Sequence, residues 1–451
     1  MRIKTEKQYV STQNPCRLCT PFGACMAFTG IAEGIPFIHG SQGCSTYIRR
    51  YLIGHFREPV DIPCSNFSET TVIFGGEENF RTGLLNVIEQ YKPQLVGIAT
   101  TCLAETIGDD LNQFVHRFEE ESCGNGPILV PVSTPSYQGS HMEGFHRAVR
   151  AVVEKLAQPG PKLKHINVFP GMVSPEDIRH LKELLLDFGL DSMLLPDYCD
   201  SLDGGIWHQY EKNIKTGTPI DKIRRASSAR ATIEFGHTRS SSTSAGDFLL
   251  QRFGTPLYEL PIPIGVRQND RLFERLQVLS GREMPAKYSG QRGRLIDAYV
   301  DGHKYIFGKK AVVYGPEDLV VALAGFLNEI GILPVLCGTG EKKGELEESL
   351  RDVLGENFRH VTALEDTDFI EMEETAKSMG IDLVLGNSNG YKLAHSLQVP
   401  LVRVGLPIHD RIGAARIAML GYAGTQQLFD RIVNEFIRQQ QENSPVGYAH
   451  V

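Results

Sequence analysis

The sequence predicts an α/β protein made of three doubly wound domains, in which parallel sheets are covered by helices on both faces. Short apolar runs rich in β-branched residues alternate along the whole chain with stretches of helical periodicity, as repeated βα units require. No low-complexity tract interrupts this alternation. The 451 residues are enough for two or three separate hydrophobic cores.

Eight apolar runs are the predicted strands, and a helical pattern follows most of them. Continuous apolar runs of this length are typical of strands that are buried on both faces of a parallel sheet. In chain order the predicted strands are Ile35–His39, Gln94–Thr100, Ile128–Val132, His165–Phe169, Ala311–Tyr314, Pro334–Cys337, Leu383–Gly386 and Leu401–Val404.

Two breaks divide the chain into domains. Pro and Gly residues in "AQPGPKLK" (157–164) separate a helical pattern from a new strand, and "FGKK" (307–310) precedes the apolar run "AVVYG". We therefore expect domains at 1–160, 161–305 and 306–451. The serine-rich "RSSSTSAG" (239–246) lies between a strand and a helical pattern and is predicted to be a loop.

Composition excludes several classes of protein. The net charge is −8 and the Lys and Arg residues are dispersed, so no basic surface for nucleic acid is expected. The longest apolar stretch, around Leu319–Leu327, is far shorter than the roughly 18 residues that cross a bilayer. The start "MRIKTEKQYV" lacks the apolar core of a signal peptide. We expect a cytoplasmic protein with neither a nucleic-acid nor a membrane partner.

Cysteines recur at one topological position in the first predicted domain. A reducing compartment favours free, metal-bound or catalytic thiols over disulfides, and the chain has nine cysteines. The carboxyl ends of parallel strands share one edge of a sheet, and helix amino termini favour thiolate over thiol. Four side chains follow a predicted strand or precede a predicted helix at this edge, and they predict a pocket for a soft metal centre: Cys19, Cys44, Cys102 and Ser136.

The spacing of these residues favours one kind of metal centre over others. The pair Cys16-x-x-Cys19 has no matching second pair, so a zinc site of the usual spacing is not indicated. A redox CxxC normally follows a strand, which this pair does not. Dispersed thiolates suit an iron–sulfur cluster, and the incomplete ligand set predicts that a partner subunit shares it. Core packing is the alternative for any single cysteine.

A series of short motifs occurs in order along nearly the whole chain. They are "HGSQGC" (39–44), "HFREP" (55–59), "FGGEEN" (74–79), "TTCLAETIGDDL" (100–111), "TPSYQGSH" (134–141), "QRGRLIDAYVD" (291–301), "LGNSNG" (385–390) and "VRVGLPIHDR" (402–411). Together they resemble the β-type subunit of nitrogenase component 1 and its relatives. The resemblance implies three Rossmann-like domains, a heterotetramer of two α and two β chains, and a reductase supplied with electrons by an ATP-hydrolysing iron protein.

The resemblance also implies specific cofactors. An [8Fe-7S] P-cluster would lie at the α/β interface with three cysteines from each subunit. Matched motif by motif, the β-side ligands fall on Cys19, Cys44 and Cys102, and the serine that can join an oxidised cluster falls on Ser136. The partner subunit would hold the catalytic iron–sulfur cofactor, and the iron protein would bind MgATP. No catalytic residue is expected on this chain.

Three further cysteines and one histidine have no role that the resemblance assigns. Core packing is the first expectation for Cys25, whereas the roles of Cys16 and Cys64 stay open. His39 either tunes a cluster sulfur by hydrogen bonding or is a satisfied turn histidine. The glycine-rich "CGTGEKKG" (337–344) follows a strand but lacks the full dinucleotide-binding pattern, so no nicotinamide site is expected.

Two other sites are implied by matching positions. Arg57 with Glu58, and Asp297 with Asp301, match a divalent-cation site between two β subunits. The two aspartates are four residues apart, which places both carboxylates on one helical face. Solvated surface charge is the alternative for this set. Phe74 matches a residue near the docking surface of the iron protein, and an aromatic buried in a turn is its alternative.

The choice of family member depends on the combination of features. "LLPDYCDSLDGG" (194–205) resembles the scaffold proteins that assemble the nitrogenase cofactor, which commonly retain only the "HGSQGC" cysteine on the β-like side. Cys19 and Cys102 are both present here, which predicts a working reductase. The combination resembles methylthio-alkane reductase, which cleaves carbon–sulfur bonds in small thioethers. The alternatives are a nitrogenase β subunit that serves dinitrogen reduction and the β-like subunit of the assembly scaffold.

Overall fold

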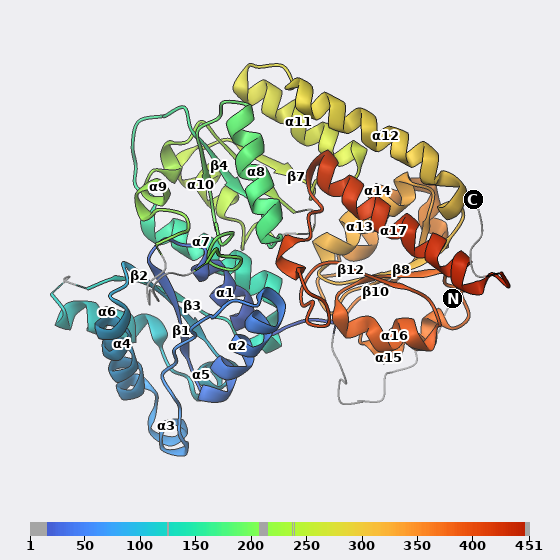
Figure 1. The fold of residues 1–451 in the computed structure, drawn as a ribbon. Helices are drawn as coiled ribbons and strands as arrows, with labels where there is room; N and C mark the ends of the chain where they lie inside the picture. The colour runs from blue at the N-terminus through green and yellow to red at the C-terminus, as the bar shows by residue number, and fades with distance from the viewer. Residues whose placement is uncertain (1–15, 124–125, 207–214, 237, 239, 447–451) are drawn as a thin grey trace.

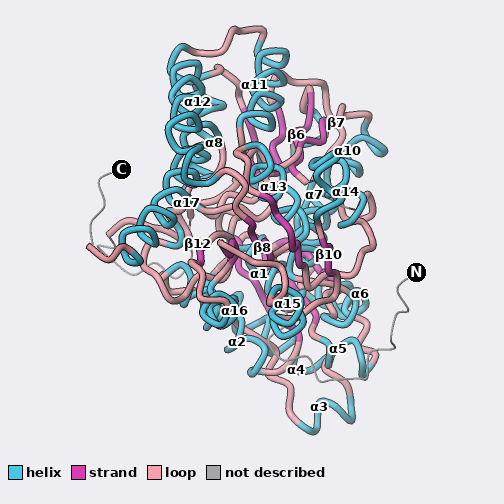
Figure 2. The backbone as a smooth tube through the Cα atoms, turned by 90° about the vertical axis from the view of Figure 1, so that its right-hand side faces the viewer, coloured by secondary structure: helices cyan, strands magenta, loops and turns pink. Residues whose placement is uncertain are grey.

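The computed structural model describes residues 16–123, 126–206, 215–236, 238 and 240–446. Three sheets lie in three lobes of the molecule (Figure 1), and every strand pair in the described residues is parallel. Figure 2 shows strands through the middle of the molecule and helices around them. The predicted α/β class is therefore confirmed.

The first sheet has the strand order β1-β2-β3. All six residues of the central strand β2 are buried, because helices cover both faces. The elements of this lobe are α1 (Thr20–Thr29), β1 (Gly34–His39), α2 (Gln42–Phe56), α3 (Glu69–Phe74), α4 (Glu77–Tyr91), β2 (Leu95–Thr100), α5 (Cys102–Ile107), α6 (Leu111–Glu121), β3 (Ile128–Val132), η1 (Ser136–Gln138) and α7 (His141–Leu156).

The second sheet has the strand order β5-β4-β6-β7. β5 therefore lies on one side of β4, and β6 and β7 lie on the other side. Its elements are β4 (Ile166–Phe169), α8 (Pro175–Asp187), β5 (Ser192–Leu194), α9 (Ile220–Arg224), η2 (Ala226–Ser228), β6 (Ala231–Phe235), α10 (Ala245–Phe253), β7 (Leu257–Leu260), α11 (Val266–Ser280) and α12 (Ala286–Ile306).

The third sheet has the strand order β10-β9-β8-β11-β12. The chain adds β9 and β10 on one side of β8, and then β11 and β12 on the other side. Loops diverge where such a sheet changes direction, between β8 and β11. Its elements are β8 (Lys310–Tyr314), α13 (Glu317–Glu329), β9 (Leu333–Gly338), α14 (Leu346–Leu354), η3 (Gly355–His360), β10 (Thr362–Leu364), α15 (Phe369–Ala376), β11 (Leu383–Gly386), η4 (Ser388–Gly390), α16 (Tyr391–Ser396), β12 (Leu401–Arg403), η5 (Ala414–Arg416) and α17 (Gly421–Asn443).

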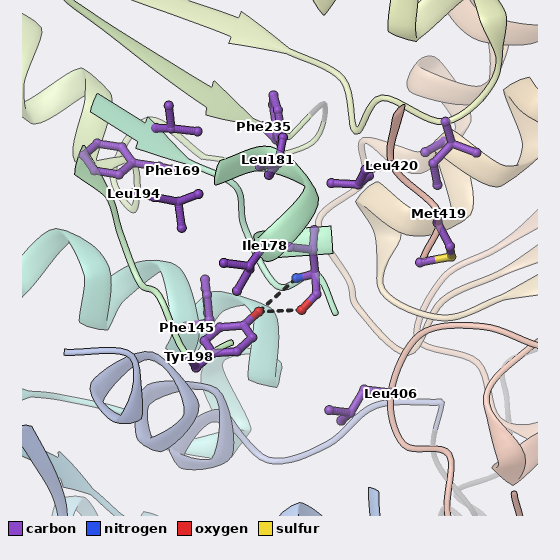
Figure 3. Close-up of a cluster of buried hydrophobic side chains, with 14 of the residues drawn as sticks. Phe145, Phe169, Ile178, Leu181, Leu194, Tyr198, Phe235, Leu406, Met419 and Leu420 are labelled. Atoms are coloured by element: carbon purple, nitrogen blue, oxygen red, sulfur yellow. Dashed lines mark hydrogen bonds between the residues drawn. The ribbon is translucent and has the colours of Figure 1, made fainter. Parts of the chain in front are cut away.

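One hydrophobic core joins the three lobes. Phe28 of the first lobe, Phe169 of the second and Val313 of the third belong to the same cluster of buried side chains. Figure 3 shows part of it, where the buried Tyr198 hydroxyl donates to the Val173 carbonyl at 2.6 Å and accepts from the Val173 N–H at 3.0 Å. Because the polar group is satisfied, the tyrosine can be buried at this junction. The core fixes the lobes against one another.

The eight predicted strands all occur, each within one residue of its predicted ends. Four short strands were not predicted. β5 and β10 have only three residues each, too few for a pattern, whereas Glu234 and Glu259 interrupt the apolar runs of β6 and β7. The buried Glu234 accepts hydrogen bonds from the Ser244 hydroxyl at 2.7 Å and from the Gly246 N–H at 2.9 Å, partners that its own strand does not reveal.

The predicted domain boundaries stay predictions, although each sheet falls inside one of the three predicted segments. Residues 240–244 of the predicted serine-rich loop lie between β6 and α10, whereas its last two residues, Ala245 and Gly246, already belong to α10; residue 239 lies outside the described part. Among the helices that the structure describes, none is both long enough and apolar enough to cross a membrane.

Candidate metal centre

The four side chains predicted as ligands all lie where helical turns begin, at the carboxyl edge of the first sheet. Cys19 is the N-cap of α1, and Cys44 lies in the first turn of α2 just after β1. Cys102 is the first residue of α5 after β2, and Ser136 begins η1 after β3. Because β1, β2 and β3 are parallel neighbours, these turns meet at one edge.

Direct contacts connect these residues. The Ser136 N–H donates to Cys102 Sγ at 3.2 Å, and the Thr20 N–H donates to the Ser136 hydroxyl at 3.2 Å. Burial, with smaller contributions from the charges of Cys44 and Cys102, raises the pKa of the Cys19 thiol to about 11. The structure thus joins Ser136 to Cys102 and to Thr20, the residue next to Cys19, and places Cys44 near enough to influence the Cys19 thiol.

The three thiols share an intermediate degree of exposure. Cys19, Cys44 and Cys102 are all free and half-buried. The Ser41 hydroxyl donates to Cys44 Sγ at 3.7 Å, so this sulfur also has a local donor. Thiols that are partly open at a sheet edge can be reached by a second polypeptide, as a shared metal centre would require.

The donor set fits a cluster better than a single ion. Among the residues that the structure describes, no three His, Cys, Asp or Glu side chains converge as ligands of one metal ion. An iron–sulfur cluster binds each thiolate to a different iron, so its ligands are spaced farther apart than those of one zinc ion. Three thiols with a serine nearby also suit soft iron–sulfur chemistry better than a hard cation.

Close backbone packing fixes the position of Cys19. A Cβ on Gly23 of α1 would overlap the His141 carbonyl oxygen, and a Cβ on Gly144 of α7 would overlap the Thr20 carbonyl oxygen. Only glycine at both positions lets α1 and α7 approach this closely. The His141 N–H also donates to the Leu18 carbonyl at 3.1 Å. The helix that Cys19 caps is therefore held rigidly against α7.

The His39 ring is paired with a carboxylate through one of its two nitrogens. Its Nε2 lies 3.0 Å from Asp109 Oδ2, and both side chains are buried. Asp109 Oδ1 in turn accepts from the Gly76 N–H at 3.1 Å. Burial lowers the pKa of His39, and the hydrogen bond to Asp109 opposes that shift. The pair links the end of β1 to the turn that follows α3.

Phe74 is one of the most exposed apolar side chains. It ends α3, which projects from the first lobe (Figure 1), and its side chain is 82% exposed. The neighbouring Ile73 is 74% exposed. An aromatic buried in a turn, the alternative from sequence, is therefore excluded. Contiguous apolar groups of this kind mark surfaces for protein partners.

The two halves of the predicted β–β cation site lie on different parts of the chain. The Arg57 guanidinium donates to the His409 carbonyl at 2.9 Å, and Glu58 accepts from the Gly204 N–H at 3.1 Å. Burial raises the pKa of Glu58. Asp297 and Asp301 are exposed on α12, far from α2 in Figures 1 and 2. One chain does not bring the four together, and the site stays a prediction that needs a second copy.

The other cysteines of the amino-terminal part have structural surroundings. Cys25 is fully buried in α1, as expected for core packing. Cys16 is buried against the third lobe, where the backbones of Gly315 and Gly340 bond its sulfur. The Arg17 guanidinium donates to the Gly340 carbonyl at 3.2 Å, so the glycine-rich loop that follows β9 packs against this chain's own segment. Cys64 is half-buried beside β1.

The fold and this edge define an α/β subunit with three parallel sheets and a thiol-bearing site open to a partner. The family model described as "Nitrogenase component 1 type Oxidoreductase" matches residues 19–437, and the chain belongs to this family. It is a β-type subunit of a nitrogenase-family oxidoreductase.

Relatives of two functional kinds support this membership. The nitrogenase molybdenum-iron protein beta chain of Methanothermobacter marburgensis is 35% identical, with 95% of each chain covered. The nitrogenase iron-molybdenum cofactor biosynthesis protein NifN of Bradyrhizobium diazoefficiens is 32% identical over 98% of this chain and 93% of its own. The solved structure "Nitrogenase Cp1 at pH 6.5" has a TM-score of 0.94 at 32% identity, covering 99% of this chain and 98% of that one.

Sequence reasoning missed the residues that support the candidate ligands. Asp109 lies in the motif "TTCLAETIGDDL", but its partner His39 is 70 residues away. Gly23 and Gly144 carry no chemistry and matter only through the approach of two helices. Both glycines lie outside the motifs that carry the resemblance, so no local signal in the sequence indicated them.

Proposed function

We propose that this chain is the β-type subunit of an α2β2 reductase in which Cys19, Cys44 and Cys102 bind an [8Fe-7S] P-cluster shared with an α-type subunit. The observation that carries the proposal is the group of half-exposed thiols at one sheet edge, with Ser136 bonded to Cys102. Three thiols cannot complete the ligand set of so large a cluster, so the α-type subunit supplies the rest. Ser136 is available as a further ligand.

The chain's own residues hold and tune the thiolates. The amino termini of α1, α2 and α5 favour the charged thiolate form. The N–H of Ser136 and the hydroxyl of Ser41 donate to sulfur, and such hydrogen bonds contribute to the potential of a bound cluster. When bound, the cluster supplies one-electron redox chemistry between an iron protein that hydrolyses MgATP and the iron–sulfur cofactor of the α-type subunit.

Two surfaces of the chain fit the remaining partners. The exposed Ile73 and Phe74 at the tip of α3 are the proposed contact for the iron protein. The turn that follows α3 is connected to the end of β1, near the thiols, through the hydrogen bonds of Asp109 and His39. Asp297 and Asp301 of one copy, with the Arg57–Glu58 segment of a second copy, form the proposed divalent-cation site between β subunits.

The proposed reaction of the complex is reduction of small methyl thioethers with cleavage of a carbon–sulfur bond. Its support is the combination of a complete thiol set with a body similar both to reductase β chains and to a cofactor biosynthesis protein. Dinitrogen reduction is the second candidate, favoured by the names of the molybdenum-iron and vanadium-iron relatives. A role in the assembly scaffold is the third.

Iron analysis and low-temperature EPR of the purified α/β complex test the cluster. We expect about eight P-cluster irons for each α/β pair, since full cysteine ligation implies that number. A four-iron signature bridging the subunits would instead support the assembly scaffold.

Substrate assays with the matching iron protein test the reaction. Dinitrogen, acetylene and a methyl thioether would be supplied separately, and release of a thiol from the thioether is the expected outcome. Robust dinitrogen reduction without thioether cleavage would favour the nitrogenase candidate and contradict the thioether proposal.

A further inference from the structure

A cavity lies where the three lobes meet, outside the candidate metal centre. Its volume is about 60 Å³. Its walls include residues 170–174 after β4, residues 316, 318 and 319 after β8, and residues 405–406 after β12. The space outside the carboxyl ends of parallel strands is where ligands bind in open α/β sheets. Figure 3 shows Leu406, Met419 and Leu420, three of the wall residues, between the lobes.

The walls are largely apolar, but they include the imidazoles of His55, His141 and His146 and the buried carboxylate of Asp318. Methionines are prominent, and their flexible thioethers adapt to small guests of different shape. The methionines in the wall are Met26, Met142, Met172 and Met419. Such a lining, with few polar groups, is typical of sites for small molecules.

His141 offers a hydrogen-bond donor that the chain does not use. Its Nδ1 accepts from the Leu18 N–H at 3.4 Å, which places the ring proton on Nε2. That Nε2 is buried and has no hydrogen-bond partner among the described residues. His55, also in the wall, likewise carries its ring proton on Nε2, because its Nδ1 accepts from the Ile408 N–H at 2.8 Å. A buried N–H without a partner costs free energy that a ligand could recover.

The imidazoles of His141 and His55 are uncharged. Burial lowers the pKa of His141 to about 4 and that of His55 to about 3. Neutral imidazoles offer no attraction for an anion. The volume of the cavity limits the size of the ligand. One water occupies about 30 Å³ in the liquid and a dry cavity of about 150 Å³ binds benzene, so a cavity of about 60 Å³ suits a molecule between these two sizes.

We propose that this cavity binds an uncharged molecule of about two to four non-hydrogen atoms, with an apolar body and one acceptor that bonds His141 Nε2. The site is independent of the metal cluster, and its occupancy does not depend on the proposed reaction. It is nevertheless adjacent to the candidate centre, because Leu18 contacts His141 and directly precedes Cys19.

Crystals of the α/β complex pressurised with xenon test the site without turnover. Xenon fits small dry cavities, and its anomalous signal reports its position. We expect a xenon site in this cavity.

Acetonitrile and propyne have the same shape and three non-hydrogen atoms, but only acetonitrile has a strong acceptor. Acetonitrile should displace xenon at an approximately tenfold lower concentration than propyne, as one hydrogen bond provides.

Two variants separate the contribution of the His141 hydrogen bond from that of the cavity volume. In His141→Asn, the amide oxygen can still accept from the Leu18 N–H, but the shorter side chain leaves no donor at the Nε2 position. Xenon should therefore bind, and the preference for acetonitrile should vanish. Ala414→Leu, which adds a larger side chain to the wall, should remove xenon; if that variant fails to assemble, His141→Asn alone decides. Ordered water in place of xenon, or equal displacement by the two competitors in the unmodified complex, would overturn the proposal.

Discussion

The carboxyl edges of the first and third sheets carry the same kinds of residue but differ in how they are covered. At the first edge, Cys19 and Cys102 are half-exposed and lie beside other thiols. At the third, Cys16 and Cys337 are fully buried, and burial raises the pKa of each thiol to about 12. The third edge is closed by this chain's own Cys16–Arg17 segment, whereas the first is left open.

The difference indicates what makes a cysteine available as a ligand. A thiol covered by its own chain stays protonated and behaves as a small apolar side chain. A thiol at an open edge, with N–H donors and further thiols beside it, can lose its proton to a metal. Sheet topology alone therefore does not distinguish the two edges, and the covering segment decides.

The largest expected effect separates the two classes of thiol. Cys44→Ala should remove most of the cluster iron from the complex, because it deletes a ligand at the open edge. Cys337→Ala, the matched control at the covered edge, should retain full iron and lower stability by about 1 kcal/mol. Iron content per α/β pair measures both. Equal iron loss in the two variants would contradict the distinction.

A smaller effect should follow from the helix that Cys19 caps. Gly23→Ala should destabilise the chain by about 3 kcal/mol, since the new methyl group would overlap the His141 backbone. Gly293→Ala on α12 is the control, because nothing lies within 4 Å of its Cβ position and alanine favours helix by about 1 kcal/mol. The thermal midpoints of the two complexes should move in opposite directions. A Gly23→Ala complex as stable as the unmodified one would show that α1 can shift freely.

The smallest effect concerns charge at the covered edge. Burial raises the pKa of Glu317 from 4.5 to about 8, and Lys343 opposes the shift. Between those pH values the folded chain keeps a proton that the unfolded chain releases, so stability falls as pH rises. Glu317→Gln should remove this dependence and be about 2 kcal/mol more stable than the parent at pH 8.

Thermal midpoints at pH 5 and pH 8 measure this effect. Glu347→Gln is the control, because Glu347 is exposed on α14, where it pairs with the exposed Arg351. The control should keep the parent's pH dependence. An unchanged slope in Glu317→Gln would mean that another group controls the loss of stability.

The sequence allowed much of the fold and the candidate ligands to be predicted. Buried parallel strands are continuous apolar runs, so their positions follow from a local pattern. The thiol edge followed from the same pattern, because residues just after parallel strands share one side of a sheet. Strands interrupted by a buried charge, such as β6 with Glu234, have no such local signal.

Exposure and long-range pairing could not be predicted in this way. Cys16 and Cys19 are three residues apart, yet one is covered by the third lobe and the other is open. The His39–Asp109 pair and the cavity at the lobe junction both depend on packing between segments distant in sequence. These features depend on how the lobes meet, which no local window of the sequence contains.

The short stretch of backbone between Cys16 and Cys19 limits how far the first and third lobes can move apart. Three residues span at most about 11 Å even when fully extended. The first of these cysteines is held by the third lobe, and the second caps a helix of the first. A hinge opening between those lobes would therefore pull directly on Cys19. Any such motion in this subunit must be small or must displace the Cys19 sulfur at the thiol-bearing edge.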